Sequence, residues 1–400
     1  MERSAKHSAG SSPERVLLAV GPLPPPINGL SQAFAHVAKE MGPRGWKVEV
    51  VDAADRSPPR AGSSFSWSRS FEVVRVFRQV VSRLRRADVV YVTIAQSRLG
   101  FAKDLLILGA AFAAKRPVVI HMHGGNFGGF YAGLTVPEQL VVRTALARVQ
   151  AIVVLTESLR ADFKMSPSWE RQTVAIANAC EGSTGAVRNH PGQEWRLLFL
   201  SNLLPSKGYR ETLLAAAELG RQRPSLRVTL ALAGDLVPEQ VFPSKEAQRE
   251  DLDALMRSLP PNVRAEYKGI VTGPEKRTLF SSSDVFLLPT DYVNEGQPIA
   301  IIEAMRAGLP VIATAWRGIP ETVSPAMREL LLSARDVSAI SAKLTQLADT
   351  PQLYDAQSAE SLRHGASFTL DRHLDALNDV LLSAAAAVSS LPSQGLAHVE

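Results

Sequence analysis

Two glutamates eight residues apart are the side chains of this chain best suited to chemistry. The stretch from Asp291 to Pro310 has the sequence DYVNEGQPIAIIEAMRAGLP, so Glu295 precedes an expected helix and Glu303 lies inside it among apolar neighbours. A carboxylate is costly to bury without a partner, which argues against a merely solvated helix face. Glu295, with the backbone N–H groups of Gly296 and Gln297, can hold sugar hydroxyls, and Glu303 can accept the paired hydroxyls of a ribose.

A lysine stands at a second turn between a strand and a helix. In the stretch LFLSNLLPSKG, Lys207 precedes Gly208 near an expected helix amino terminus. A cation there can reach a diphosphate and offset the negative charge that grows on a leaving group. Asn202, five residues earlier, can offer a diphosphate only a hydrogen bond and no positive charge. The alternative is a solvated lysine that contacts no ligand.

A histidine follows a third strand. The stretch PVVIHMHGG places His121 and His123 on one side of the strand, with His123 at its carboxyl end beside two glycines. In that position His123 can hydrogen-bond a sugar hydroxyl or help to screen charge during bond cleavage. The alternative is a buried histidine with a structural role.

A proline-rich loop with the sequence GPLPPPINGLS joins the first strand to a helix expected to begin near Ser31. Gly29 would allow an anionic group to approach the backbone at this helix amino terminus. A stiff turn without a ligand explains the loop equally well. Its glycine spacing differs from those of dinucleotide-binding loops and P-loops, which disfavours an oxidoreductase.

These residues require parallel sheets to position them. Short apolar runs alternate with helical stretches over most of the 400 residues, which is typical of strand–helix–strand units. Six strands are expected before the polar segment Glu181 to Gln193 and five after it; they span Arg15 to Gly21, Lys47 to Ala53, Asp88 to Ile94, Pro117 to His123, Ala151 to Thr156 and Val174 to Ala177, then Arg196 to Leu200, Arg227 to Ala233, Arg264 to Gly269, Asp284 to Pro289 and Pro310 to Thr314.

We therefore predict an α/β protein of two Rossmann-like, doubly wound parallel-sheet domains that face each other across a cleft. The domains are expected at residues 1–185 and 194–367, with a helix at residues 368–388 that crosses back to the first domain.

Composition excludes several classes of protein. With 46% hydrophobic and 21% charged residues, the chain is typical of soluble globular proteins. The single cysteine, Cys180, cannot form an intramolecular disulfide, and no Cys/His cluster predicts a zinc site. The apolar runs Val16 to Val20 and Leu105 to Ala114 are too short for a signal peptide and for the ~20-residue span of a bilayer, respectively. We expect a cytoplasmic protein without a structural zinc site.

The net charge of +5 is unevenly distributed, since residues up to Gly185 contain 23 Lys and Arg against 14 Asp and Glu. No nucleic-acid-binding signature accompanies this charge, so an anionic membrane or a phosphorylated acceptor is a better candidate partner. The segment from Ser70 to Arg86 has Val73, Phe77, Val80 and Leu84 at helical spacing among arginines. Such a helix can lie on anionic lipid, or it can pack its apolar side on the sheet as an ordinary domain helix.

From Arg15 to about Phe368 the chain resembles the family 4 glycosyltransferases of the GT-B fold. The segment NEGQPIAIIEAMRAGLPVIAT, followed by RGIPE, looks like the E-x7-E donor motif of that family and its glycine-rich turn. The resemblance implies a retaining transferase that needs no metal ion and no cofactor and uses a nucleotide diphosphate sugar as its donor substrate. Bacterial relatives with HGG and EGQP stretches often build surface polysaccharides on lipid carriers, so a glycan or lipid-linked acceptor is expected.

The resemblance also implies roles for individual residues. Glu295 would contact the donor sugar, Glu303 the ribose, and Lys207 the diphosphate. His123 would be the active-site histidine of the first domain and Gly29 would face the phosphates. The turn at Gly234 and the stretch at Val271 look like the family's strand-end glycine turn and the segment beside the nucleotide base.

One residue departs from the family pattern. Asn202 stands where the family usually has an arginine, so one of two cations on the diphosphate is missing. Either another basic residue substitutes for it, or leaving-group stabilisation is weaker by on the order of 10²-fold in rate. Asn202 thus motivates an alternative function, a catalytically impaired binding or scaffold protein. An epimerase of the same fold is disfavoured by the E-x7-E pattern.

Overall fold

A computed structural model describes residues 15–54, 67–182, 184–239 and 241–389. They form two six-stranded sheets, each flanked by helices. In the first sheet every strand is parallel to its neighbours, in the order β2-β1-β3-β4-β5-β6. Its strands are β1 (Arg15–Gly21), β2 (Trp46–Asp52), β3 (Val89–Thr93), β4 (Val118–His121), β5 (Ala151–Val154) and β6 (Thr173–Ala175).

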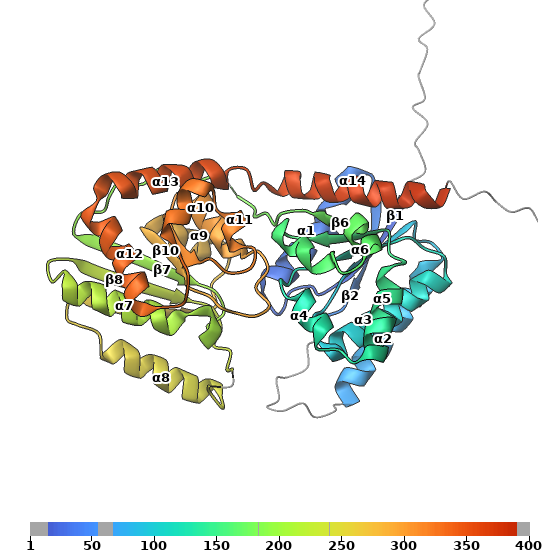
Figure 1. Ribbon diagram of the computed structural model, residues 1–400, viewed down its shortest axis with the longest axis horizontal. Coiled ribbons are helices and arrows are strands. Elements are labelled where there is room, and N and C mark those ends of the chain that lie inside the picture. Colours follow the sequence, from blue (N-terminus) through green and yellow to red (C-terminus); the bar gives the residue numbers. More distant parts are fainter. Residues whose placement is uncertain (1–14, 55–66, 183, 240, 390–400) are drawn as a thin grey trace, which may run out of the picture.

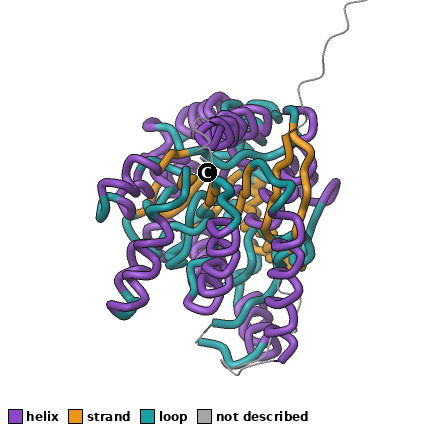
Figure 2. The backbone as a smooth tube through the Cα atoms, turned by 90° about the vertical axis from the view of Figure 1, so that its right-hand side faces the viewer, coloured by secondary structure: helices purple, strands orange, loops and turns teal. Residues whose placement is uncertain are grey.

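Helices cover both faces of the first sheet, which explains why its strands are nearly continuous apolar runs. Successive side chains of β1 point to opposite faces, so Leu18 packs with α2, α3 and α5 while Leu17 packs with α1 and the C-terminal helix α14. Viewed from its end, the molecule has its strands enclosed between helices (Figure 2). The helices of this half are α1 (Gly29–Glu40), α2 (Trp67–Leu84), α3 (Arg98–Ala113), α4 (Phe127–Ala132), α5 (Val136–Leu146) and α6 (Pro167–Gln172).

The second sheet is also fully parallel, in the order β12-β11-β10-β7-β8-β9. Its strands are β7 (Glu194–Leu200), β8 (Arg227–Ala233), β9 (Val263–Gly269), β10 (Val285–Leu288), β11 (Val311–Thr314) and β12 (Leu331–Leu332). Its helices are α7 (Tyr209–Gln222), α8 (Lys245–Arg257), α9 (Gly273–Ser282), α10 (Ile299–Arg306), α11 (Ile319–Thr322), α12 (Val337–Asp349) and α13 (Pro351–Gly365).

The eleven strands predicted from the sequence are all present, with bounds that differ by at most two residues. The prediction omitted β12, because an edge strand of two residues is too short to show a pattern. Helix α1 begins at Gly29 rather than near Ser31, because Asn28 caps it: its side chain accepts a hydrogen bond from the backbone N–H of Ser31.

Helix α14 (Leu370–Ser389) returns from the second half and lies along the first sheet (Figure 1). Its side chains Leu374, Leu377 and Leu381 are fully buried there. Arg44 forms ion pairs with two of its carboxylates, at 2.9 Å to Asp371 and 2.8 Å to Asp375. The predicted fold class, including the helix that crosses back, is confirmed.

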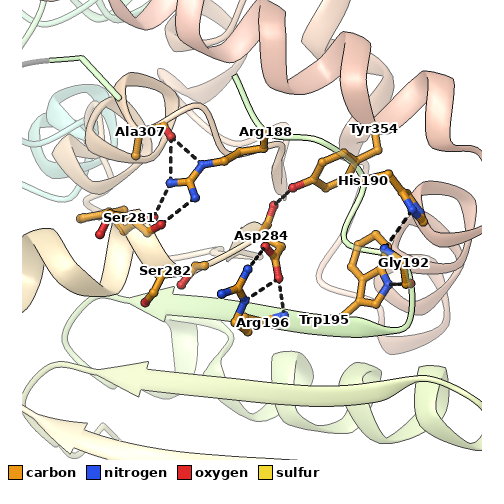
Figure 3. Close-up of polar contacts among 12 residues, drawn as sticks. Arg188, His190, Gly192, Trp195, Arg196, Ser281, Ser282, Asp284, Ala307 and Tyr354 are labelled. Carbon is orange, nitrogen blue, oxygen red and sulfur yellow. Dashed lines mark hydrogen bonds and ion pairs between the residues drawn. The ribbon is translucent and has the colours of Figure 1, made fainter. Parts of the chain in front are cut away.

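The segment predicted as the linker is fastened to the second half of the chain (Figure 3). The Arg188 guanidinium donates to the carbonyl oxygens of Phe280, Ser281 and Ala307 at 2.6 to 3.3 Å. Nearby, Arg196 and Asp284 form an ion pair at 2.8 Å between the starts of β7 and β10. These contacts lie at the amino ends of the strands, so they anchor the sheet at the end opposite to the candidate site.

In each sheet the strand order reverses beside the first strand of that half, between β1 and β3 and between β7 and β10. Open parallel sheets bind ligands at such points, outside the carboxyl ends of the strands.

Within the described ranges, none of the helices combines the length and the apolar character needed to cross a membrane.

Candidate active site

A cavity of about 550 Å³ opens at the carboxyl ends of both sheets. Its walls come from the loops after β1, β4, β6, β7, β8, β9 and β10 and from the first turns of α1, α9 and α10. The structure brings together here all of the site residues predicted from the sequence: Gly29, His123, Asn202, Lys207, Gly234, Val271, Glu295, Gly296, Gln297 and Glu303. This places them around one cavity; their individual roles stay predictions.

Lys207 and Glu295 meet at the reversal point of the second sheet. Lys207 follows β7 and Glu295 follows β10, and Lys207 Nζ lies 2.6 Å from Glu295 Oε2. Both side chains are largely buried, and the Thr290 hydroxyl donates a second hydrogen bond to the same carboxylate oxygen at 3.0 Å. Lys207 also lies over the ring of Tyr292, 4.7 Å from its centre. The carboxylate and the ammonium group are thus held in defined positions before a ligand arrives.

A second lysine, which the sequence analysis did not single out, pairs with the other glutamate. Lys276, in the first turns of α9, has its Nζ 2.7 Å from Glu303 Oε1. Glu303 Oε2 is buried and has no hydrogen-bond partner among the described residues. Burial raises the pKa of Glu303, and the neighbouring Lys276 opposes that rise. The unpartnered oxygen is available to accept hydroxyl groups of a ligand.

Lys207 and Lys276 are the cations among the described residues that line the cavity. Lys276 is therefore the candidate on this cavity wall for the basic residue that would substitute for the arginine missing at Asn202. One feature of the sequence indicated Lys276: it lies in the helix that follows the strand ending at Gly269 and the stretch at Val271. A lysine in the first turns of a helix is usually solvated, so this signal was weak.

His123 lies against the first sheet's buried histidine. The ring centres of His121 and His123 are 4.0 Å apart, and the Tyr91 hydroxyl lies 2.8 Å from His121 Nδ1. Burial, and to a smaller extent His373 of α14, lowers the pKa of His123 to about 3. Its Nε2 atom has no hydrogen-bond partner in the described part of the chain. A neutral ring can hydrogen-bond a sugar hydroxyl, which favours the first of the two roles considered above over charge screening.

The two halves touch at one edge of the cavity. The backbone N–H of Gly125 donates to the carbonyl of Asn294 at 3.3 Å. A Cβ atom at Gly125 would lie 1.9 Å from the carbonyl oxygen of Glu295, and one at Gly296 would lie 2.2 Å from that of His123. The glycines of the HGG and EGQP stretches therefore allow this close approach, a role that the sequence analysis missed.

Gln297 takes part in the same interdomain contact. The Asn178 backbone N–H donates to Gln297 Oε1 at 2.6 Å, and the Asn178 side chain donates to the Gln297 carbonyl at 2.9 Å. The side-chain oxygen and the backbone carbonyl of Gln297 are therefore engaged between the domains. In residues 15–54, 67–182, 184–239 and 241–389 no group of three or more His, Cys, Asp or Glu side chains could hold a metal ion.

A protein-family model matches the part of the chain that carries the acidic pair and both lysines. Residues 185–363 match the family described as "Glycosyl transferases group 1". This segment spans both sides of the reversal point of the second sheet and includes Lys207, Lys276, Glu295 and Glu303.

Curated relatives match parts of the chain at low identity. The chain is 24% identical to the sulfoquinovosyl transferase of Arabidopsis thaliana over 335 residues, 78% of this chain and 62% of the relative. It is 28% identical to the amylovoran biosynthesis glycosyltransferase of Erwinia amylovora over 165 residues, 40% of this chain and 38% of the relative. The chain thus spans between about two fifths and three fifths of the length of these relatives.

Solved structures share the fold over nearly the whole chain. HepE of Anabaena, in complex with UDP and glucose, superposes with a TM-score of 0.68 at 16% identity, covering 92% of this chain and all of that one. At this identity the likeness establishes the GT-B fold of the chain.

Proposed function

We propose that this protein is a glycosyltransferase that moves a sugar from a nucleotide diphosphate sugar to an acceptor. The observation that carries the proposal is the convergence of two lysine–glutamate pairs on one cavity, with a neutral histidine on its opposite wall. Cations suit a diphosphate, and carboxylates suit the hydroxyls of a sugar and a ribose. The family match over residues 185–363 supports the same conclusion.

In the proposed complex Glu303 accepts the ribose hydroxyls, and Val271 and Gly234 border the base. Lys207 and Lys276 neutralise the diphosphate, with Asn202 as a hydrogen-bond donor, while Gly29 at the start of α1 faces the phosphates. Glu295 and the backbone at Gly296 and Gln297 hold the donor sugar, and His123 hydrogen-bonds one of its hydroxyls. Support for this arrangement comes from the cavity, which all of these residues line.

The proposed reaction breaks the bond between the anomeric carbon and the phosphate oxygen and forms a bond from that carbon to an acceptor oxygen. The acceptor attacks from the face that the diphosphate leaves, so the configuration is retained and no protein nucleophile is needed. The acceptor proton passes to the departing phosphate oxygen. The two lysines offset the negative charge that grows on the departing diphosphate, and this stabilises the transition state. The proposed mechanism therefore requires no metal ion.

We propose a glycan or a lipid-linked precursor as the acceptor. One relative carries the name of an amylovoran biosynthesis glycosyltransferase, which supports an acceptor of this class. A cytoplasmic protein that acts at the inner face of the membrane fits such an acceptor.

The first experiment is a thermal-shift screen with UDP, GDP and ADP, because a ligand that binds the native state raises its Tm. The sugar conjugates of the stabilising nucleotide are then tested for donor hydrolysis and for transfer. Glu295→Gln should abolish transfer in a chain that still folds but has a lower Tm, because buried Lys207 loses its partner; Asp291→Asn, outside the cavity wall in the same loop, should leave transfer intact. Full activity of Glu295→Gln would remove the assignment of Glu295.

A second candidate function is a nucleotide-sugar-binding or scaffold protein with impaired catalysis, motivated by Asn202 in place of an arginine. The two functions differ in one observable. A nucleotide that stabilises the protein, with no turnover of any of its sugar conjugates, would support the scaffold. Turnover of a single nucleotide sugar would eliminate it.

A further inference from the structure

Helix α3 is apolar on both its inner and its outer side. It lies between α2 and α5 on one face of the first sheet (Figure 1). Ile107, Leu108 and Ala111 pack into the core. The outward-facing stripe after Arg98 contains no charged residue; it consists of Leu99, Ala102, Leu106, Gly109 and Ala113. Leu99 is 78% exposed, and a helix that is apolar all round is normally covered on every side.

Helix α2 extends this apolar surface on one side. Its outward stripe contains Phe71, Val74 and Val81, and Phe71 is 70% exposed. Arg78 lies on the same stripe, since positions 71, 74, 78 and 81 follow the helical repeat, and Arg85 follows directly after the end of the helix.

The side of α2 that the sequence analysis considered for a membrane is a different one. Val80 and Leu84 are buried in the core, and Val73 and Phe77 are half-buried. That apolar stripe packs on the domain, as the alternative interpretation held. The exposed stripe went unnoticed because its apolar residues are separated by arginines.

Helix α5 extends the surface on the other side of α3. Val136, Leu140 and Val141 are exposed along it, and Val136 is 78% exposed. The three helices together carry eight of the fifteen exposed large apolar side chains found in the described part of the chain. Such concentration on one face marks an interaction surface.

The segment of the chain that contains these three helices is strongly positive. Between residues 71 and 148 the chain has eleven Lys and Arg against four Asp and Glu. Of the four acids, Asp104 is buried, Glu72 pairs with Arg75, and Glu138 lies 3.6 Å from Arg98. The fourth, Asp88, accepts a hydrogen bond from the backbone N–H of Val16. Exposed arginines for which no ion pair is found in the described part of the chain remain on α2 and α5 and just past their carboxyl ends, at positions 78, 85, 86, 143 and 148.

We propose that the outer face of α2, α3 and α5 docks onto the surface of an anionic lipid bilayer. Apolar side chains enter the boundary between headgroups and acyl chains, while the surrounding arginines contact anionic headgroups. A second copy of this chain would bring the same positive charge against itself, which disfavours self-association through this face. The inference does not depend on the proposed sugar transfer, because it concerns a face other than the cavity.

The test is flotation of the whole purified chain with phosphatidylcholine vesicles that contain or lack phosphatidylglycerol. We expect binding to the anionic vesicles only, weakened by salt. The variant Leu99→Gln/Leu106→Gln/Leu140→Gln should weaken binding by about tenfold or more. The variant Arg78→Gln/Arg85→Gln/Arg86→Gln should weaken it by on the order of 10²-fold.

A matched control replaces three apolar side chains exposed elsewhere, as Met165→Gln/Val187→Gln/Leu214→Gln. The control should bind like the unaltered chain, and circular dichroism should show all variants folded, because the altered side chains are exposed. Failure to bind anionic vesicles, or equal binding by the apolar variant and its control, would overturn the proposal. A dimer in sedimentation velocity that the apolar variant dissociates, without vesicle binding, would instead identify the face as a contact between copies of the chain.

Discussion

Lys207 Nζ lies 2.6 Å from Glu295 Oε2, at the point where the strand order of the second sheet reverses. The proposed phosphate-binding cation and the proposed sugar-binding carboxylate therefore neutralise each other in the absence of ligand. A buried charge is tolerated only with a partner. Each residue thus keeps the other stable and in place until a donor supplies a diphosphate for the lysine and hydroxyls for the carboxylate.

Replacing Lys207 should reduce both stability and catalysis. Lys207→Met leaves Glu295 as a buried charge without its cation, which typically costs about 3–5 kcal/mol in the free energy of unfolding. It also removes a charge that stabilises the leaving diphosphate, so kcat should fall by on the order of 10²–10³-fold. Denaturant unfolding and steady-state transfer rates measure the two effects. Lys207→Arg, which keeps the charge, should retain most of the stability; a Met variant as stable as the unaltered chain would show that the pair is not needed.

Nucleotide binding should weaken as the pH falls, and the loss should begin at a higher pH than it would with a glutamate of ordinary pKa. Burial raises the pKa of Glu303, so on acidification its carboxylate takes up a proton above the usual value of about 4.3. The protonated group loses an acceptor for the ribose hydroxyls. Lys276 lowers this pKa, so Lys276→Met should move the loss of affinity to a still higher pH.

Calorimetric titration with the stabilising nucleotide across a pH series measures this shift. Glu303→Gln cannot ionise and should bind weakly, without this pH-dependent step. Lys343→Met, on α12 and absent from the cavity wall, is the matched control. Identical pH curves for Lys276→Met and Lys343→Met would exclude coupling between Lys276 and Glu303.

His123 should contribute a hydrogen bond and no titration. Its pKa of about 3 keeps the ring neutral from about pH 5 to pH 8, where an unperturbed histidine would titrate. His123→Ala should lower kcat/KM by about 10–100-fold, the cost of one lost hydrogen bond to a buried hydroxyl, without changing the shape of the pH profile. His123→Asn, which retains a donor, should recover part of the rate. A limb of the profile near pH 6.5 that disappears in the Ala variant would contradict the neutral role.

Much of the fold follows from local patterns in the sequence. Parallel strands buried on both faces are continuous apolar runs, and loops with polar residues and glycine follow them, so β1 to β11 and the site loops after β1, β4, β7 and β10 could be predicted. Glu303 was identifiable because a carboxylate flanked by isoleucines needs a partner. Its partner Lys276 was not, because the pair depends on how α9 and α10 pack.

Contacts between elements account for the other omissions. The exposed apolar stripe of α2 could not be distinguished from its buried stripe, since both have helical spacing and only packing on the sheet decides which one is covered. The glycine at 125 was interpreted as a turn residue beside His123. Its closest neighbour is the carbonyl oxygen of Glu295, in the other half of the chain, which no local pattern reveals.

This contact at Gly125 can be tested directly. A Cβ atom there would lie 1.9 Å from a backbone oxygen, and backbone cannot rotate away as a side-chain end can. Gly125→Ala should therefore push the two halves apart at the edge of the cavity, at a cost of about 1–3 kcal/mol typical of overpacking. Each half keeps its own sheet and core, so circular dichroism should be unchanged.

Separation of the halves should be visible as a larger radius of gyration in solution scattering and as slower transfer. Opening also admits water to the donor, so hydrolysis should rise relative to transfer, because closure of a site excludes side reactions with solvent. Gly42→Ala is the matched control, since a Cβ atom at Gly42 meets no other atom within 4 Å. Gly125→Ala and Gly42→Ala could instead have the same radius of gyration and the same ratio of transfer to hydrolysis. In that case the contact between the halves at Gly125 would not be what closes the cavity. Protection of the donor from water would then have to come from elsewhere in the chain.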